Sequence, residues 1–249
     1  MYVTVSNRCF PDLPLAESLQ KLADLEYTAS EITLGEKPCD LAPELILRQP
    51  VEALRQCLCC RSISPTLFFY DVDLADPDYF VKFEACCRLA KQMKIVVITV
   101  RSAPLGTPYN EEIERLRRIS AVGIREGIVI AILTERGRIS GTCDSIRSLA
   151  KSVPELAVTL DPSQFIFGEE KPADYDSIMP LVSHLRLRDT TADRFQVQIG
   201  QGALEYNKLI VQLNKCRYKG ALGVDLAPLP DIDPESELRK MRLLLESLI

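Results

Sequence analysis

The residues best suited to do chemistry lie in one short segment, His184-Leu185-Arg186-Leu187-Arg188-Asp189, in which polar and apolar side chains alternate. A period of two is typical of a β-strand, and it places His184, Arg186 and Arg188 on one face and the two leucines on the other. His184 is the only histidine in the chain. It is therefore the candidate general base at neutral pH, and the alternative is a hydrogen-bonded histidine of the core.

Two aspartates are the expected partners of these arginines. An arginine that points into a folded core needs a negative partner, because burying an unpaired charge is costly. Asp161 ends the apolar run Leu156–Asp161, and Asp225 lies in the run Gly220–Leu226. We expect the guanidinium of Arg186 to bridge Asp161 and Asp225 by charge-assisted hydrogen bonds. The alternative is a buried ion pair that only stabilises the fold.

The elements that position these residues are visible as a regular alternation along the chain. Short runs rich in Val, Ile and Leu are typical of strands buried on both faces of a parallel sheet. We expect strands over Tyr2–Ser6, Tyr27–Thr33, Pro65–Val72, Ile95–Val100, Ile128–Leu133, Leu156–Asp161, His184–Leu187 and Gly220–Leu226. We expect helices over Leu15–Leu25, Val51–Cys60, Pro77–Met93, Asn110–Arg125, Cys143–Lys151, Asp174–Val182, Leu204–Asn214 and Glu235–Leu248.

Eight strands that alternate with eight helices predict an α/β fold, a single (β/α)8 TIM barrel that spans residues 1–249. Asp76 before Pro77 predicts the start of one of the helices, with a capping side chain ahead of a proline. No linker or low-complexity segment divides the chain. In such a barrel, ligand-binding residues lie at the carboxyl ends of the strands.

Polar or charged residues end almost every predicted strand. The candidate catalytic residues are Glu135 and His184, and the candidate binding residues are Arg101, Asp161, Gln164, Arg186, Arg188 and Asp225. Seven arginines lie at or just beyond these ends: Arg8, Arg101, Arg136, Arg138, Arg186, Arg188 and Arg194. Their clustering predicts that the carboxyl ends of the strands form an opening that attracts an anion, such as a sugar phosphate or a sugar acid. The alternative is that they pair with Glu31, Asp71, Asp73, Glu135 and Asp189 and leave no net field.

Composition excludes several classes of function. With 30 basic and 35 acidic residues, the chain is a poor candidate for binding DNA or RNA. It contains no apolar run of membrane-spanning length and no secretory leader at its start, so we expect no membrane partner and a cytoplasmic location. Nine cysteines are an odd number in a large chain, which indicates small buried hydrophobic residues. The alternative is a redox or zinc role for Cys57-Leu58-Cys59-Cys60, which has no second CxxC pair.

Four segments resemble motifs of the xylose-isomerase-like TIM barrels, the sugar-phosphate isomerase/epimerase superfamily. Leu160-Asp161-Pro162-Ser163-Gln164 resembles the family's Leu-Asp-x-Gly/Ser-His motif, and His184 to Asp189 resembles its His-x-His-x-Lys/Arg-Asp strand. The segment 198–204 resembles the Gly-x-Gly segment that enters the seventh helix, and 218–225 resembles the Gly-Tyr-x-Gly…Glu end of strand eight. The resemblance implies chemistry on sugars or small hydroxy-carbonyl compounds. It also implies a divalent cation, held by Glu, Asp, His or Gln, and Glu at the ends of strands five to eight.

When the family's metal ligands are aligned with this chain position by position, most of them are missing. Only Asp161 is kept: the strand-five glutamate aligns with Leu133, two residues before Glu135, and the strand-six motif histidine becomes Gln164. The strand-seven ligand becomes Arg186, and the strand-eight glutamate shortens to Asp225. Arginine has no free lone pair for a metal. A fixed positive charge about 4 Å from a dication repels it by ~8 kcal/mol at an effective dielectric constant of about 20.

We therefore expect no metal and no cofactor, with the guanidinium of Arg186 in the place of the cation. The resemblance implies an isomerase or epimerase that acts on a sugar or small hydroxy-carbonyl ligand, neutral or anionic, with the metal site lost or altered. The alternative is a barrel without catalytic activity that binds a carbohydrate or a partner protein, because a fold does not fix a function. The expected partner is a small carbohydrate-like molecule, and the oligomeric state is left open.

Overall fold

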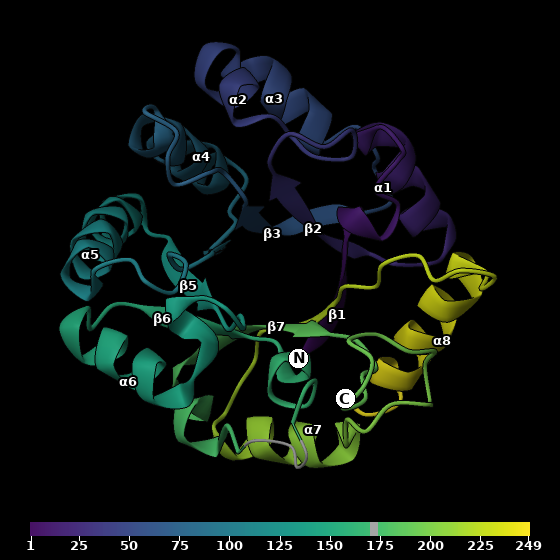
Figure 1. Cartoon of the computed structure of the whole chain (residues 1–249). Coiled ribbons are helices and arrows are strands. Elements are labelled where there is room, and N and C mark those ends of the chain that lie inside the picture. Colours follow the sequence, from purple (N-terminus) through teal and green to yellow (C-terminus); the bar gives the residue numbers. More distant parts are fainter. Residues whose placement is uncertain (170–173) are drawn as a thin grey trace.

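The computed structural model describes residues 1–169 and 174–249. In this part of the chain, eight parallel strands close into a barrel in chain order, and helices surround it (Figure 1). The strands are β1 (Tyr2–Ser6), β2 (Ala29–Leu34), β3 (Ser64–Tyr70), β4 (Val97–Val100), β5 (Val129–Leu133), β6 (Ala157–Leu160), β7 (Val182–Leu187) and β8 (Ala221–Val224). The helices are α1 (Leu15–Asp24), α2 (Pro43–Arg48), α3 (Pro50–Cys57), α4 (Tyr79–Gln92), α5 (Tyr109–Glu126), α6 (Cys143–Ser152), α7 (Tyr206–Lys215) and α8 (Pro234–Glu246). The predicted TIM barrel fold is confirmed.

The two faces of each strand are buried in different ways. On β7, Leu185 and Leu187 are fully buried in the main apolar core, which lies between strands and helices in this fold. The side chains that alternate with such residues point into the barrel. Among these inward residues, Leu67, Val97, Ala131 and Ala221 form a second apolar cluster. The barrel is therefore filled by side chains, and its polar residues gather closer to the carboxyl ends of the strands.

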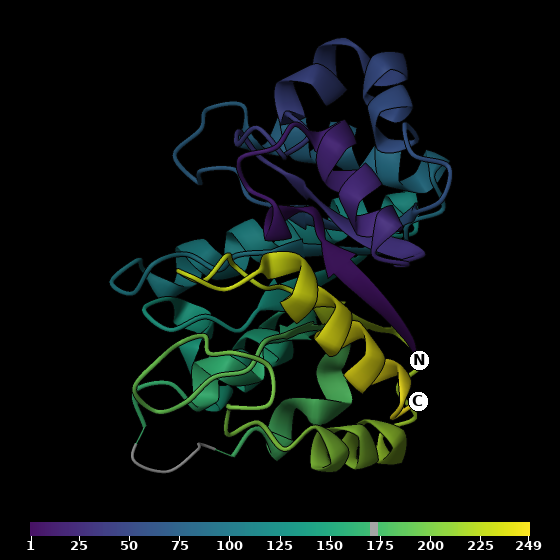
Figure 2. The ribbon, with the colours of Figure 1, turned by 90° about the vertical axis from the view of Figure 1, so that its right-hand side faces the viewer.

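The long loops lie at one end of the barrel and the chain termini at the other (Figure 2). Because all strands are parallel, their carboxyl ends meet at the loop end. We call this end the mouth. None of the helices in the described ranges is long and apolar enough to cross a membrane.

Three local predictions are corrected by the structure. The helix predicted over Asp174–Val182 is a 3-10 helix, η4 (Asp176–Leu181), and Pro180 inside it lacks the N–H that a longer α-helix needs. The helix predicted to start at Pro77 begins at Tyr79, because the side chain of Asp76 accepts from Asp78 N in a turn. Helix α2 was not predicted; its six residues are too few to show a helical period.

The nine cysteines are free thiols. Six of them are buried, Cys143 is half-buried, and Cys59 and Cys216 are exposed. Burial raises the pKa of Cys57 and of Cys87 to about 12, so these thiols stay protonated and unreactive at neutral pH. The expectation of small buried hydrophobic residues is confirmed for these six.

Candidate functional site

The centre of the mouth is occupied by Arg186. Its side chain is 7% exposed. Its Nε donates to Glu31 Oε1 at 3.0 Å, its Nη2 also donates to Glu31, and its Nη1 lies 3.3 Å from Asp225 Oδ2. The guanidinium carbon lies 4.1 Å from the centre of the Phe69 ring, within the range of a cation–π contact. Arg186 therefore joins β2 to β8 and rests on a side chain of β3.

The bridge between Asp161 and Asp225 is made by Arg188, which corrects the prediction for Arg186. The Nη2 atom of Arg188 lies 2.5 Å from Asp225 Oδ2 and 3.2 Å from Asp161 Oδ2. The register explains the difference. In the parallel pairing of β7 with β8, Arg186 lies beside Gly223 and Leu187 lies beside Val224. The residues that follow the two strands, Arg188 and Asp225, therefore lie side by side. Arg186 lies one inward position deeper, where its side chain reaches across the barrel to Glu31.

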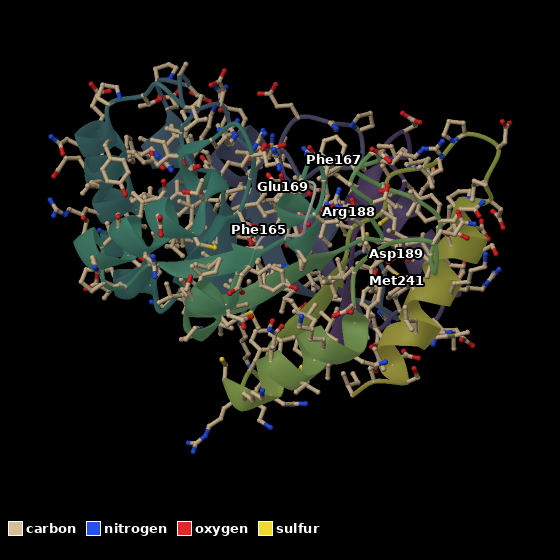
Figure 3. All side chains as sticks on the ribbon, turned by 60° about the horizontal axis from the view of Figure 1, so that its bottom comes forward. Phe165, Phe167, Glu169, Arg188, Asp189 and Met241 are labelled. Atoms are coloured by element: carbon tan, nitrogen blue, oxygen red, sulfur yellow. The ribbon has the colours of Figure 1, made fainter. Side chains whose placement is uncertain are left out.

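The second oxygen of Asp161 is used by its own chain. Asp161 caps the 3-10 helix η3 (Pro162–Phe165): its Oδ1 accepts from Ser163 N at 3.0 Å and from the Ser163 hydroxyl. Both oxygens of this carboxylate therefore have donors. Figure 3 shows Arg188 and Asp189 at the end of β7. The Arg188 guanidinium also stacks on the ring of Phe195, 4.7 Å from its centre.

The electrostatics of this cluster keep Glu31, Asp225 and Arg186 charged. Burial raises the pKa of Glu31, but the positive charge of Arg186 and the hydrogen bonds from His184 and Arg186 outweigh burial and hold that pKa below its ordinary value. Burial raises the pKa of Asp225 too, and the charges of Arg186 and Arg188 outweigh it in the same way. For Arg186, burial favours the neutral form, but the carboxylates of Asp225 and Glu31 raise its pKa further above neutrality.

His184 lies inside the barrel and is fully buried. Its Nε2 lies 2.8 Å from Glu31 Oε2, so Glu31 is the shared partner of His184 and Arg186. The ring lies against Gly223, where a Cβ atom would come within 2.9 Å of His184 Cε1. This is the arrangement of a hydrogen-bonded core histidine, and a catalytic role for His184 stays a prediction.

A second set of ion pairs continues around the mouth. Arg8, after β1, donates to both oxygens of Asp40 at 2.9 and 2.6 Å and to Asp71 Oδ2 at 2.6 Å. Arg101, after β4, donates to both oxygens of Glu135, with Nε–Oε2 at 2.9 Å, and lies 3.3 Å from Asp71 Oδ1. Asp71 is therefore shared by two arginines.

Beside this set lies a cavity of about 570 Å³. Its lining residues are Tyr70, Asp71, Val72, Asp73, Leu74, Ala75, Tyr79, Arg101, Pro104 and Arg138. The side chain of Arg101 is 36% exposed, compared with 7% for Arg186 and 11% for Arg188. Arg138 Nε lies 3.1 Å from Glu135 Oε2. The cavity therefore offers guanidinium donors and carboxylate acceptors to a ligand from three neighbouring strand ends, those of β3, β4 and β5.

A buried ion pair on α5 holds one wall of this cavity. Arg115 donates bidentately to Glu112, and its Nη2 donates to the backbone oxygen of Arg101 at 2.9 Å. Glu112 Oε1 accepts from Ala103 N at 3.1 Å. The backbone is thus held on both sides of Ser102, which fixes the direction in which Arg101 leaves β4.

Several predicted residues lie elsewhere. The backbone N of Gln164 donates to Asp161 O at 3.2 Å, but its side chain accepts from Arg136 N at 3.0 Å and lines a separate cavity of about 430 Å³, so it does not join the ion pairs of the Asp161 carboxylate. Asp73 and Asp189 were expected as possible partners of arginine; instead, Asp73 accepts from Ala75 N and Asp189 from Gly200 N. Glu31, Asp71 and Glu135 do pair with arginines.

Sequence reasoning missed three contributors to the mouth. Asp40 lies beyond the end of β2, and nothing in its neighbourhood marks it as a partner of Arg8. Phe69 lies two residues from Leu67 and from Asp71, on and just beyond β3, and this period of two could have placed Phe69 inside the barrel. The Glu112–Arg115 pair has the i, i+3 spacing of an ordinary surface pair, so no pattern reveals that it is buried.

The residues at the strand ends do not fit a divalent cation. The guanidinium of Arg188 lies between Asp161 and Asp225, and that of Arg186 between Asp225 and Glu31. Within residues 1–169 and 174–249, no group of three or more His, Cys, Asp or Glu side chains is arranged to hold a metal ion. A cation between these carboxylates would have to displace two arginines that cannot lose their charge.

No protein-family model matches the chain, and neither does any curated protein. Solved structures match over the whole chain. A D-tagatose 3-epimerase-like protein is 16% identical with a TM-score of 0.75, and the match covers 100% of this chain and 98% of that one. A xylose isomerase domain protein from Alicyclobacillus acidocaldarius is 14% identical with a TM-score of 0.79 and the same coverage. A xylose isomerase-like TIM barrel protein from Mycobacterium smegmatis, solved in complex with magnesium, is 12% identical with a TM-score of 0.78, also over 100% and 98%. The chain thus has the fold of the xylose-isomerase-like barrels.

Proposed function

We propose that this xylose-isomerase-like barrel binds a small carbohydrate-like ligand at its mouth without a divalent cation, and that metal-dependent isomerase chemistry is lost. One observation carries the proposal: Arg188 lies between Asp161 and Asp225, and Arg186 between Glu31 and Asp225. The fixed guanidinium groups supply the positive charge that these carboxylates need. The class of ligand is supported by structural neighbours that are named as sugar epimerases or epimerase-like proteins.

The central cluster is poorly suited to proton transfer. A general acid or base works best when its pKa lies near the working pH. The pKa values of Glu31 and Asp225 are held below their ordinary values, which makes both carboxylates weak bases. The pKa of Arg186 is raised, so it donates hydrogen bonds but gives up no proton. Binding and orientation are what this set of residues does best.

The cavity beside Arg101 is the proposed ligand site. Pockets for small molecules have volumes of roughly 300–1,000 Å³, and this cavity of about 570 Å³ falls within that range. Hydroxyl groups both donate and accept hydrogen bonds, so they can bind carboxylates and guanidinium groups at once. Asp71, Arg101 and Arg138 offer both kinds of partner in one wall.

The second candidate is an isomerase that works without a metal and uses Glu135 and His184 for proton transfer. Glu135 lies at the mouth, where Arg101 and Arg138 hold its carboxylate. Both oxygens of the Glu135 carboxylate accept hydrogen bonds from Arg101, so guanidinium donors already engage the group that would have to take a proton. His184 is buried beneath the mouth with Glu31 as its partner. Both observations favour binding over catalysis.

The proposal is tested by thermal unfolding and calorimetric titration with a panel of ketoses, aldoses and polyols. We expect at least one member to bind in EDTA, with an affinity that Mn²⁺, Mg²⁺ and Zn²⁺ leave unchanged, and with no change in the sugar by NMR. Binding that appears only with a divalent ion contradicts the proposal, as does binding of no member. Conversion of the sugar in EDTA supports the second candidate instead.

Replacing Arg101 by methionine is expected to weaken binding of the best sugar of this panel by about 10- to 100-fold, since hydrogen bonds to charged groups contribute about 1.5–3 kcal/mol. Titration calorimetry measures the affinity. Arg136→Met is the matched control, because Arg136 is exposed to a similar degree, pairs with Glu169 and lines the other cavity. Equal losses in the two variants would place the ligand outside the cavity beside Arg101.

A further inference from the structure

We propose that the mouth selects an uncharged sugar or polyol and excludes phosphorylated ones, because carboxylates of the chain already occupy its anion-binding groups. The inference rests on the proposed function for the location of the ligand site. It names the ligand class and gives Asp189 a specific role, which is to occupy a backbone site that would otherwise accept phosphate.

Five arginines at the mouth are all paired with carboxylates. In the described part of the chain, Arg8, Arg101, Arg138, Arg186 and Arg188 contact six carboxylates: Glu31, Asp40, Asp71, Glu135, Asp161 and Asp225. Five positive groups against six negative ones leave the set with one net negative charge. A phosphate would have to take a guanidinium away from a carboxylate and leave that carboxylate unpaired. For these five of the seven arginines, the anion-attracting mouth expected from their number is therefore not favoured.

The loop after β7 contains a backbone anion site that is already filled. In TIM barrels, phosphate groups are frequently bound by the loops after strands seven and eight. Gly200 has φ +91°, and such a turn can aim neighbouring N–H groups at one point. Asp189 Oδ2 lies at that point and accepts from Gly200 N at 2.5 Å and from Gly202 N at 3.4 Å. Asp189 is 2% exposed.

The fit around Asp189 is close. A Cβ atom on Gly202 would lie 2.8 Å from Asp189 Cγ, so the glycine allows the carboxylate to approach the loop backbone. The neighbouring Ile199 N donates to Glu237 Oε2 of α8 at 2.7 Å. The loop amides that could bind a phosphate are thus bound to two carboxylates, and a second anion would be repelled by both.

The same arrangement continues at the start of α8, beyond the loop after β8. The side chain of Asp233 accepts from Glu235 N and Ser236 N, each at 3.2 Å. Glu235 and Glu237 add negative charge to this first turn. The amides on this side of the mouth are therefore bound by carboxylates before any ligand arrives.

The test uses inorganic phosphate as the probe, in titrations of the wild-type chain and of Asp189→Ser, which empties the backbone site. We expect no binding to the wild type at millimolar phosphate and at least a tenfold gain in affinity for Asp189→Ser. Asp193→Ser is the control, because Asp193 is an exposed carboxylate of the same loop and its loss changes the net charge equally. Asp189→Asn is the second variant, for use if the serine variant does not fold, because the asparagine keeps an acceptor oxygen in place. We expect a smaller gain in its affinity for phosphate.

Binding of phosphate to the wild type, or an equal gain in the Asp189 and Asp193 variants, would overturn the inference. Glucose and glucose 6-phosphate form a matched pair for the wild-type mouth, and tighter binding of the phosphorylated sugar would also overturn it. Failure of every neutral sugar to bind contradicts the proposed function alone. The gain of phosphate binding in the Asp189 variants needs no sugar, so the two failures are distinguishable.

Discussion

Replacing Arg186 by methionine is expected to lower the free energy of unfolding by about 3–5 kcal/mol, the usual cost of removing one partner from a buried ion pair. The side chain of Arg186 is almost fully buried and is the partner of both Glu31 and Asp225. Methionine fills a similar volume, but among residues 1–169 and 174–249 it leaves the buried Glu31 carboxylate with only His184 as a side-chain partner. Urea unfolding followed by circular dichroism measures the change.

Two further variants separate the buried charge from ordinary surface effects. Arg48→Met removes an exposed i, i+4 pair with Glu44 and is expected to cost less than about 1 kcal/mol. The double variant Arg186→Met/Glu31→Gln removes both charges, so it is expected to recover part of the loss, and the double-mutant cycle gives the coupling between them. If Arg186→Met matched Arg48→Met in stability, Arg186 would not be the central ion-pair partner described above.

Acid is expected to destabilise the wild-type chain progressively as the pH falls from about 5. The pKa values of Glu31 and Asp225 in the folded chain lie below their ordinary values of 4.5 and 3.8. In this range the unfolded chain binds protons that the folded chain does not. The stability that these groups contribute is therefore fully present above their ordinary pKa values and is lost as the pH falls through the lowered ones. Glu31 faces His184 and Arg186, and Asp225 faces Arg186 and Arg188.

Unfolding curves in urea between about pH 3 and pH 7 check this prediction. The double variant Arg186→Met/Glu31→Gln has lost one of these carboxylates and the arginine that both share, so its stability is expected to depend less steeply on pH below 5. A wild-type stability that stays constant or rises as the pH falls from 5 to 3 would contradict the lowered pKa values.

The architecture was predictable because it depends on patterns that are local in the sequence. The apolar runs coincide with the eight strands to within a few residues, and the amphipathic segments with most of the helices. The exceptions have local causes. Pro180 limits the segment after β6 to a 3-10 helix, and α2 is too short to show a helical period.

The inward direction of Arg186 and Arg188 was predictable from the alternation along β7, but their partners were not. The partner of a long side chain depends on which strands face it across the barrel and at which level. Arg186 and Asp161 come from neighbouring strands, yet Arg186 reaches Glu31 of β2, and its guanidinium lies over the ring of Phe69 of β3. Such relations follow from barrel closure, and no local pattern of residues contains them.

A guanidinium differs from a bound cation in ways that matter for function. It is part of the chain and stays charged at every physiological pH, so its charge cannot be removed by a chelator. It donates hydrogen bonds in fixed directions but offers no open coordination position to a substrate oxygen. The guanidinium groups of Arg101 and Arg138, in the wall of the cavity, are therefore suited to holding hydroxyl groups in place.

The most direct test of the account is a titration of the EDTA-treated, dialysed protein with Mn²⁺, in which electron paramagnetic resonance measures the free ion. With Arg188 between Asp161 and Asp225, we expect no stoichiometric Mn²⁺ site. One tightly bound ion per chain that is lost in Asp161→Asn or Asp225→Asn would show that the carboxylates at the strand ends hold a metal, and would contradict the central claim.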